Sequence, residues 1–291
     1  MTGQANPEPS GKSAVIDWWT EMRGLAAMLA VVIAFHSLIA KPFYIPSISM
    51  MPNLLVGDRL IVSKYPYGWS WVSASFHVLP RGTTRILPRT PEYGDVVIVV
   101  PPDSDDDYIK RVVALPGDRI AVVNGQIILN GRAVPQIVQP SIALPVDAND
   151  PCDPEVFPGA RFRDMRGQSF CELPILRETL PNGASYDIID HRDQPLDHMA
   201  EIRVPAGHVF LMGDNRDHSA DSRAAVYERG LGGPVPLANL GGRAEFTTFS
   251  LDGSESWNPL SWWHALRGDR SWRNLRPAIE SYPREPIRAS R

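Results

Sequence analysis

The sequence has few lysines, few cysteines and only one long apolar run. Only four of its 29 Lys and Arg residues are lysine: Lys12, Lys41, Lys64 and Lys110. Arginine holds its proton too tightly to act as a base, so any amine base must come from these four positions. The net charge of −4 over 291 residues gives no electrostatic reason to expect a nucleic-acid partner.

The two cysteines, Cys152 and Cys171, exclude a disulfide-rich scaffold. They allow either one disulfide or two free thiols, and the sequence alone does not choose between them. Abundant proline and glycine, 28 and 22 residues, favour turns and short strands over long helices.

One long apolar run occurs, GLAAMLAVVIAFHSLIA, at residues 24–40. Tryptophans and Arg23 precede it, and Lys41, Pro42 and aromatic residues follow it, as is typical of the anchors at a membrane interface. We expect a transmembrane anchor over residues 18–43. A cleaved signal peptide and a buried helix are the alternatives. The run ends at Lys41-Pro42 and not at the small residues of a cleavage site, which disfavours the signal peptide.

The charges around this run indicate an orientation. Lys12 and Arg23 lie before it, and only Lys41 lies close behind it. The positive-inside rule then predicts the N-terminus in the cytoplasm and the body outside. Residues 1–13 are polar and are expected to form a disordered cytoplasmic tail.

From residue 58 onward the pattern is typical of strands. Short β-branched runs recur as RLIVSK, DVVIVV, YIKRVVA, RIAVV and QIILN, and Asn124-Gly125 between two apolar runs predicts a hairpin. We therefore expect a mostly β fold with a membrane-anchored catalytic core at 44–133 and 206–250. Residues 134–205 are interpreted as an inserted subdomain or a set of long loops.

Residues 251–291 form a segment rich in Trp and Arg. Its last part, 265–291, carries seven arginines against three acids, which is consistent with a solvated tail or a contact with anionic lipid heads. Aromatic residues near Trp69 and Trp262 either pack in the core or enter the membrane interface.

Two serines, Ser47 and Ser49, follow the anchor in YIPSISMMPNLL. No Gly-x-Ser-x-Gly elbow surrounds a serine, although seven histidines leave a Ser-His-Asp triad open. Lys110 in the strand-like DYIKRVVALPGDRI is a second source of a base. Burial that lowered its pKa from about 10.4 to about 8 would cost roughly 3 kcal/mol. A lysine that extends from a strand edge to solvent is the alternative.

The stretch GDNRDHSADSR is dense in paired charges. It forms either a solvated turn or a network that supports a site. Asp214, Asp217 and Asp221 also raise the idea of a metal loop, but the spacing lacks the Gly and the Glu of a Ca²⁺ loop, so no metal is expected.

Together, PSISMMPNLLVGDRLIVSKYPYG, YGDVVIV, DYIKRVVALPGDRI, GDNRDHSADSR and GPVPLANLGGRA resemble, in order and rough spacing, the bacterial type I signal peptidases. The similarity covers about residues 42–245. It implies a membrane-bound serine endopeptidase that removes signal peptides from exported preproteins through an acyl-enzyme, with no cofactor. It also implies an enzyme of the bacterial inner membrane that cuts after small residues. Some family members have two spans, whereas the one apolar run here predicts a single pass with the catalytic body on the periplasmic side, and we expect a monomer.

The resemblance also implies roles for individual residues. Ser49 is expected to be the nucleophile and Lys110 the general base, and the Ser49 N–H and the Ser47 hydroxyl are expected to form the oxyanion hole. Ser219 is expected to orient Lys110 by a hydrogen bond. The remaining expectations are two ion pairs, Asp214 with Arg111 and Asp221 with Arg223, and an apolar substrate pocket of Phe43, Ile45, Leu54 and Ile109.

Three positions depart from the family pattern. Asn53 and Ile48 border the site and predict a shift in substrate preference, whereas His218 is expected to be neutral. A processing peptidase or self-cleaving repressor on a related fold is one alternative, and no DNA-binding domain is visible before residue 44. An inactive membrane-tethered scaffold is the other, and the intact Ser49 and Lys110 disfavour it.

Overall fold

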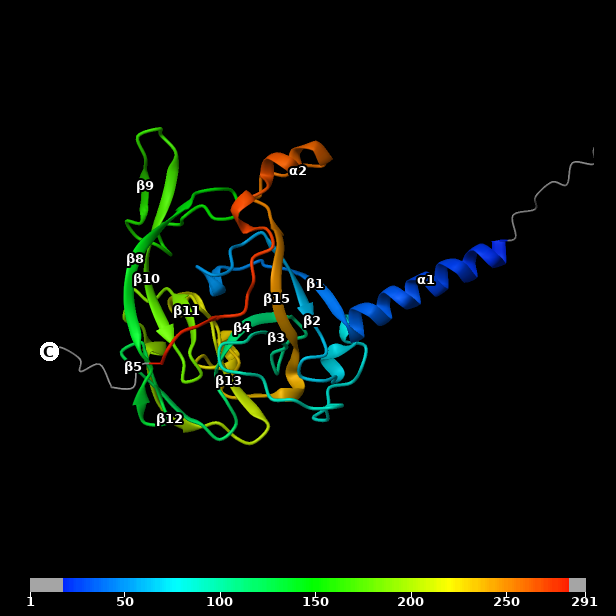
Figure 1. Cartoon of the computed structure of the whole chain (residues 1–291), viewed down its shortest axis with the longest axis horizontal. Helices are drawn as coiled ribbons and strands as arrows, with labels where there is room; N and C mark the ends of the chain where they lie inside the picture. The colour runs from blue at the N-terminus through cyan, green and yellow to red at the C-terminus, as the bar shows by residue number, and fades with distance from the viewer. Residues whose placement is uncertain (1–17, 283–291) are drawn as a thin grey trace, which may run out of the picture.

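The computed structural model describes residues 18–282, so the predicted tail at 1–13 lies outside the described residues. Helix α1 (Trp18–Leu38) projects from a β-rich body (Figure 1). At 1.5 Å per residue it is about 30 Å long, which matches the apolar thickness of a bilayer. Among the described residues it is the one helix long and apolar enough to cross a membrane, and none of its side chains is buried.

The principal sheet curls around the middle of the body. Its strand order is β1-β2-β15-β3-β4-β13-β14, with every neighbouring pair antiparallel. The strands, in sheet order, are β1 (Ala40–Tyr44), β2 (Asp58–Ser63), β15 (Leu240–Ser250), β3 (Val96–Val99), β4 (Tyr108–Ala114), β13 (His208–Met212) and β14 (Val235–Pro236).

Strand β1 begins two residues after α1 ends. The expected anchor at 18–43 is therefore longer than the helix, because residues 40–43 belong to β1 and pair with β2. Pro42 lacks an N–H and fits here because β1 lies at the edge of the sheet. The chain thus passes from the apolar helix directly into the principal sheet.

Residues 134–205 contain long strands joined by loops. Four strands, in the order β16 (Ala278–Ile279), β11 (Ala184–Ile188), β10 (Ser169–Thr179) and β8 (Gln136–Pro145), form a second sheet, and β9 (Arg161–Arg163) pairs with β10. The pattern looked irregular because Pro140 lies inside β8 and Pro174 lies at a register shift of β10. Proline inside a sheet is confined to edges and bulges such as this one.

A third sheet contains the predicted hairpin. Its order is β12 (His198–Arg203), β5 (Arg119–Val123), β6 (Gln126–Leu129) and β7 (Arg132–Ala133). Asn124 and Gly125 join β5 to β6 with φ values of 51° and 77°, which are the left-handed conformations of a type I′ turn. The prediction of a mostly β fold with one apolar N-terminal helix is confirmed.

The rest of the helical structure is short. Helix α2 (Pro259–Ala265) lies on a C-terminal excursion (Figure 1). Single 3₁₀ turns are η1 (Ile48–Met50), η2 (Trp71–Ser73), η3 (Ser75–His77), η4 (Pro195–Asp197), η5 (Arg216–His218), η6 (Val226–Glu228), η7 (Leu237–Asn239) and η8 (Gly268–Arg270).

Cys152 and Cys171 form a disulfide, which decides the alternative that the sequence left open. Both are buried in a hydrophobic cluster that also contains Met51 and Leu55 from the segment after the serines. The disulfide region and the serine segment therefore share one core.

Part of the Arg-rich C-terminal segment packs against the body, so the segment is not a wholly solvated tail. Arg270 is buried and forms an ion pair with Asp58 at 2.6 Å, and its Nη2 donates to the Asn53 carbonyl at 3.0 Å. Arg267 pairs with Asp147 at 2.6 Å. Both guanidinium groups hold the C-terminal segment against the body.

Candidate active site

The segment that carries the serines is a short turn with apolar anchors. Ile45 and Met50 are buried in one hydrophobic cluster, and Ser49 lies between them in η1 with 7% of its surface exposed. Ser47 precedes η1 in an extended conformation, with φ −137° and ψ 158°. The buried anchors fix the backbone on both sides of Ser49.

Strand β4 places Lys110 against this turn. The Lys110 ammonium Nζ donates to Ser49 Oγ at 3.0 Å and to the Ile109 carbonyl at 3.0 Å. Lys110 is 4% exposed and lies in the interior of the sheet, between β3 and β13. The two residues are 61 positions apart in the sequence and in hydrogen-bond contact in the fold.

Burial decides the protonation of this amine. Loss of solvent lowers the pKa of Lys110 to about 8, although the carboxylates of Asp221 and Asp214 partly offset the effect. A substantial neutral fraction is then present near pH 8, and a neutral amine beside a hydroxyl can accept its proton. The arrangement is chemically able to activate Ser49.

Ser47 and Ser219 flank the nucleophile in different ways. Ser47 Oγ lies 3.3 Å from Ser49 Oγ. Ser219 is buried, yet its hydroxyl has no hydrogen-bond partner in residues 18–282, so the expected hydrogen bond to Lys110 is not formed. The second Lys110 contact goes to the Ile109 carbonyl instead, because this acceptor is adjacent in the same strand.

Ser219 nevertheless lies next to the site across Gly213. A Cβ atom at Gly213 would be 2.2 Å from Ser219 Oγ and 2.5 Å from the Ser49 carbonyl oxygen. Residue 213 must therefore lack a side chain for the last motif to approach the nucleophile turn this closely.

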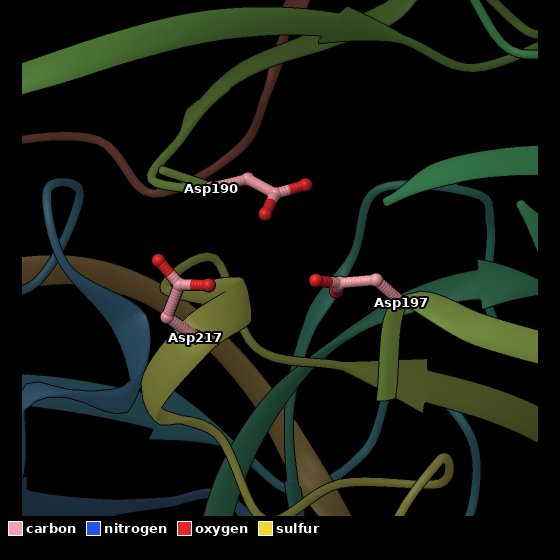
Figure 2. Close-up of side chains that lie close together, drawn as sticks. All are labelled: Asp190, Asp197 and Asp217. Carbon is pink, nitrogen blue, oxygen red and sulfur yellow. The ribbon is translucent and has the colours of Figure 1, made fainter. Parts of the chain in front are cut away.

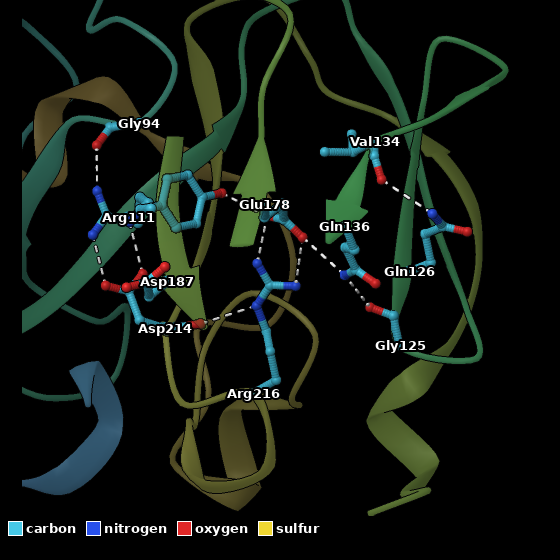
Figure 3. A network of polar contacts seen from close by, with 12 residues as sticks. Gly94, Arg111, Gly125, Gln126, Val134, Gln136, Glu178, Asp187, Asp214 and Arg216 are labelled. Carbon is cyan, nitrogen blue, oxygen red and sulfur yellow. Dashed lines mark hydrogen bonds and ion pairs between the residues drawn. The ribbon is translucent and has the colours of Figure 1, made fainter. Parts of the chain in front are cut away.

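Both expected ion pairs are present in the structure. Asp214 accepts two hydrogen bonds from Arg111, at 2.7 and 2.6 Å, and both side chains are buried (Figure 3). Asp221 accepts two from Arg223, each at 3.0 Å. Arg111 lies next to Lys110 in β4 but has different partners, as the strand alternation predicts.

A buried acid–base network behind the site was missed in the sequence. Glu178 of β10 accepts hydrogen bonds from Arg216 at 3.1 and 2.6 Å and from the Tyr186 hydroxyl at 2.6 Å (Figure 3). Burial alone would raise the pKa of Glu178, but Arg216 and the hydrogen bonds outweigh it and lower this pKa. Arg111 stacks on Tyr186 at 4.1 Å, so the network reaches the residue beside Lys110.

Asn53 also joins this region. Its Nδ2 donates to Asp214 Oδ2 at 2.8 Å and to the Asp187 carbonyl at 2.6 Å. The departure from the family pattern at this position therefore contacts the Asp214–Arg111 pair. The sequence placed Asn53 at the border of the site, four residues after Ser49, but did not indicate its contact with Asp214.

The four residues expected to line the substrate pocket lie in one hydrophobic cluster. Ile45, Leu54 and Ile109 are buried in it, and Phe43 packs against it. Leu275 from the C-terminal segment joins the same cluster, which the sequence did not indicate. A cavity of about 210 Å³ beside Leu54 is lined by Arg111 and by the C-terminal residues 273–278.

The aspartates considered as a metal loop separate in the fold. Asp214 and Asp221 are engaged by arginines, whereas Asp217 groups with Asp190 and Asp197, with oxygens within 4.8 Å of one another (Figure 2). In the described part of the chain, these three carboxylates lie close enough together to hold a cation. Burial, with the neighbouring carboxylates Asp197 and Asp217, raises the pKa of Asp190 to about 6, so Asp190 takes up a proton only as the pH falls below neutral.

Comparison with known proteins shows which family has a similar sequence. The sequence pattern described as "Signal peptidase, peptidase S26" matches residues 18–249. Signal peptidase I of Rickettsia akari is 30% identical over 284 residues, covering 94% of this chain and 91% of that protein. Signal peptidase I of Rickettsia canadensis is 31% identical over 255 residues, covering 84% and 82%.

A solved signal peptidase I from Enterococcus faecalis is also similar, at 18% identity and a TM-score of 0.28, covering 53% of this chain and 97% of that one. The family assignment rests on the sequence matches, which run through the serine turn, the lysine strand and the acidic motif. The chain belongs to the signal peptidase family, peptidase S26.

Proposed function

We propose that this protein is a membrane-anchored serine endopeptidase that removes signal peptides from exported preproteins, with Ser49 as nucleophile and Lys110 as general base. The observation that carries the proposal is the buried Lys110 amine, 3.0 Å from Ser49 Oγ, with its pKa lowered to about 8. Ser-Lys pairs are a known variant of the serine-hydrolase triad.

The reaction proceeds in two steps. Neutral Lys110 takes the Ser49 proton while Oγ attacks the scissile carbonyl, and the protonated amine then gives this proton to the leaving nitrogen of the mature protein. The signal peptide remains as an ester on Ser49. Lys110 next takes one proton from a water molecule as the water oxygen attacks the ester, and it returns this proton to Ser49 as the ester bond breaks. The signal peptide leaves as a carboxylic acid, which releases the second water proton to solvent.

The oxyanion of both steps needs donors close to Ser49. We assign the Ser49 N–H and the Ser47 hydroxyl to this role. The 3.3 Å separation of the two serine oxygens supports the assignment, because the oxyanion forms within bonding distance of the Ser49 oxygen.

The substrate is expected to bind as an extended strand with small side chains before the cut. The apolar cluster of Phe43, Ile45, Leu54 and Ile109 supports this, because tightly packed apolar walls leave shallow pockets that suit alanine-sized groups. Strand β1 is at the edge of the sheet, where an extended peptide can add by backbone hydrogen bonds.

The location is proposed from the anchor and the disulfide. Helix α1 holds the body at the bilayer, and the Cys152–Cys171 disulfide is typical of an oxidising compartment. We therefore place the protein in the inner membrane with a single pass, its N-terminus in the cytoplasm and its body in the periplasm, and we propose that it is a monomer.

The test is cleavage of a preprotein by the full chain in detergent. Ser49→Ala, Lys110→Ala and Lys110→Arg should each lose activity by about 10³-fold or more, the arginine because it is not deprotonated. Lys64→Met is the matched control, since Lys64 is also buried and its pKa is also lowered to about 8. Full cleavage by Ser49→Ala or Lys110→Ala would overturn the proposal.

A further inference from the structure

Asn215, which follows Asp214 in the last motif, binds the backbone of the nucleophile turn. Its own N–H donates to the Ser49 carbonyl at 3.1 Å. Its side-chain Nδ2 donates to the Ile48 carbonyl at 3.2 Å. Asn215 is fully buried, so both bonds are shielded from competing water.

The Ile48 carbonyl belongs to the same peptide group as the Ser49 N–H. In a planar trans peptide these two groups point in opposite directions, so holding the carbonyl also sets the direction of the N–H. We propose that Asn215 is a positioning residue that aims the Ser49 N–H at the oxyanion. This inference rests on the proposed function, in which that N–H stabilises the tetrahedral intermediate.

The Asn215 amide has no other hydrogen-bonding role in residues 18–282. Its Oδ1 is buried without a partner, which is an unfavourable arrangement for an amide. Turning the amide over would place this oxygen against the Ile48 carbonyl, so the observed orientation is the favourable one. The other bond to the Ile48 carbonyl, from the Met51 N–H at 3.1 Å, arises within the turn itself. Asn215 is thus the support that reaches this peptide from outside the turn.

Both neighbours of Asn215 are fixed by buried ion pairs. Asp214 is held by Arg111, and Arg216 is held by Glu178 (Figure 3). Backbone bonds tie the same segment to Ile189, whose N–H donates to the Asp214 carbonyl at 2.9 Å and whose carbonyl accepts from the Arg216 N–H at 2.8 Å. Asn215, which holds the Ile48 carbonyl, is therefore rigidly positioned, as the precise orientation of the Ser49 N–H requires.

The expected effect falls on the chemical step. Removing an oxyanion donor outright costs about 10²–10³-fold in kcat. Asn215→Ala keeps the Ser49 N–H but removes the hydrogen bond that fixes its orientation. We therefore expect kcat to fall by about 10- to 100-fold, with KM changed less than about threefold. A signal-peptide aldehyde, which forms a tetrahedral adduct, should lose affinity in parallel with kcat, whereas the pH at which Lys110 titrates should not move.

The experiment compares full-length variants in detergent, using kcat, KM, aldehyde affinity, the pH profile and the thermal midpoint. Asn239→Ala is the matched control, because Asn239 Nδ2 likewise donates to a backbone carbonyl, that of Val100, at 3.0 Å away from the site. It should lower the thermal midpoint to a similar extent and leave kcat within about twofold. Asn215→Ser, which is too short to reach Ile48, provides a second variant if Asn215→Ala does not fold.

The outcomes separate this inference from the proposed function. If Ser49→Ala and Lys110→Ala are inactive while Asn215→Ala and Asn215→Ser keep wild-type kcat and aldehyde affinity, the positioning role is refuted and the dyad stands. An equal loss of kcat in Asn239→Ala would also refute it, because the effect would then follow from stability. If the serine and lysine variants remain active, the proposed function itself fails.

Discussion

The lowered pKa of Lys110 predicts a measurable cost in stability. The shift from 10.5 to about 8, caused mainly by burial, corresponds to about 3 kcal/mol at 1.36 kcal/mol per pKa unit. Between these two values the unfolded chain holds the proton and the folded chain does not. Stability therefore rises with pH across this window, and the full cost is present below pH 8.

Lys110→Met removes the titrating group without emptying the space. The stability of the variant relative to wild type should be greatest at pH 7 and should decline by about 3 kcal/mol as the pH rises toward 10.5. Activity should be absent at every pH. In the wild type the same titration should appear as a rate that rises toward a plateau above pH 8.

The assay is urea unfolding of the detergent-solubilised chain, followed by tryptophan fluorescence at several pH values. Lys64→Met is the control, because burial, aided by Lys41, also lowers the pKa of Lys64 to about 8. It should show the same dependence of stability on pH and retain activity. A stability difference between Lys110→Met and wild type that stays constant from pH 7 to 10 would refute the reasoning.

Two further predictions concern the buried charges. Glu178→Leu leaves the Arg216 guanidinium buried and unpaired, so the free energy of unfolding should fall by about 3–5 kcal/mol, and a loss below about 1 kcal/mol in urea unfolding would contradict this. Asp190 has a pKa raised from 3.8 to about 6, so the folded state loses stability as the pH rises through that range. Asp190→Asn should therefore stabilise the protein by about 2 kcal/mol at pH 7.5 and have little effect at pH 4. Asp193→Asn, at an exposed position, is the control and should not stabilise the protein at either pH. Equal unfolding curves for Asp190→Asn and wild type at pH 7.5 would argue against this prediction.

The predicted strands were recognisable because their signals are local. Alternation around Lys110 and the Asn124-Gly125 turn each depend on a few consecutive residues. The proximity of Lys110 to Ser49 was expected from the order of the motifs and not from local pattern, because nothing near either residue specifies the other. Its geometric form, a hydrogen bond from strand β4 to the turn η1, required the fold.

The buried ion pairs could not be assigned in the same way. Glu178 is 38 positions from Arg216, and Asp58 is 212 positions from Arg270, in a chain with 29 basic and 33 acidic residues. So many pairings are compatible with the composition that the correct partners follow only from the strand register. Proline inside β8 and β10 hid two long strands for a similar reason, since the bulge that accommodates Pro174 depends on its neighbour strands.

The attachment of Arg270 to Asp58 and to the Asn53 carbonyl gives the active site an order of assembly. Ser49 is synthesised early, but the loop after it is held by Arg270, a residue made more than two hundred positions later. Lys110 and Asn215 arrive at intermediate times. A chain made only as far as Asn215 thus carries Ser49 and Lys110 without the contacts of Arg270, so the loop after Ser49 gains its full set of hydrogen bonds only when residue 270 has been made.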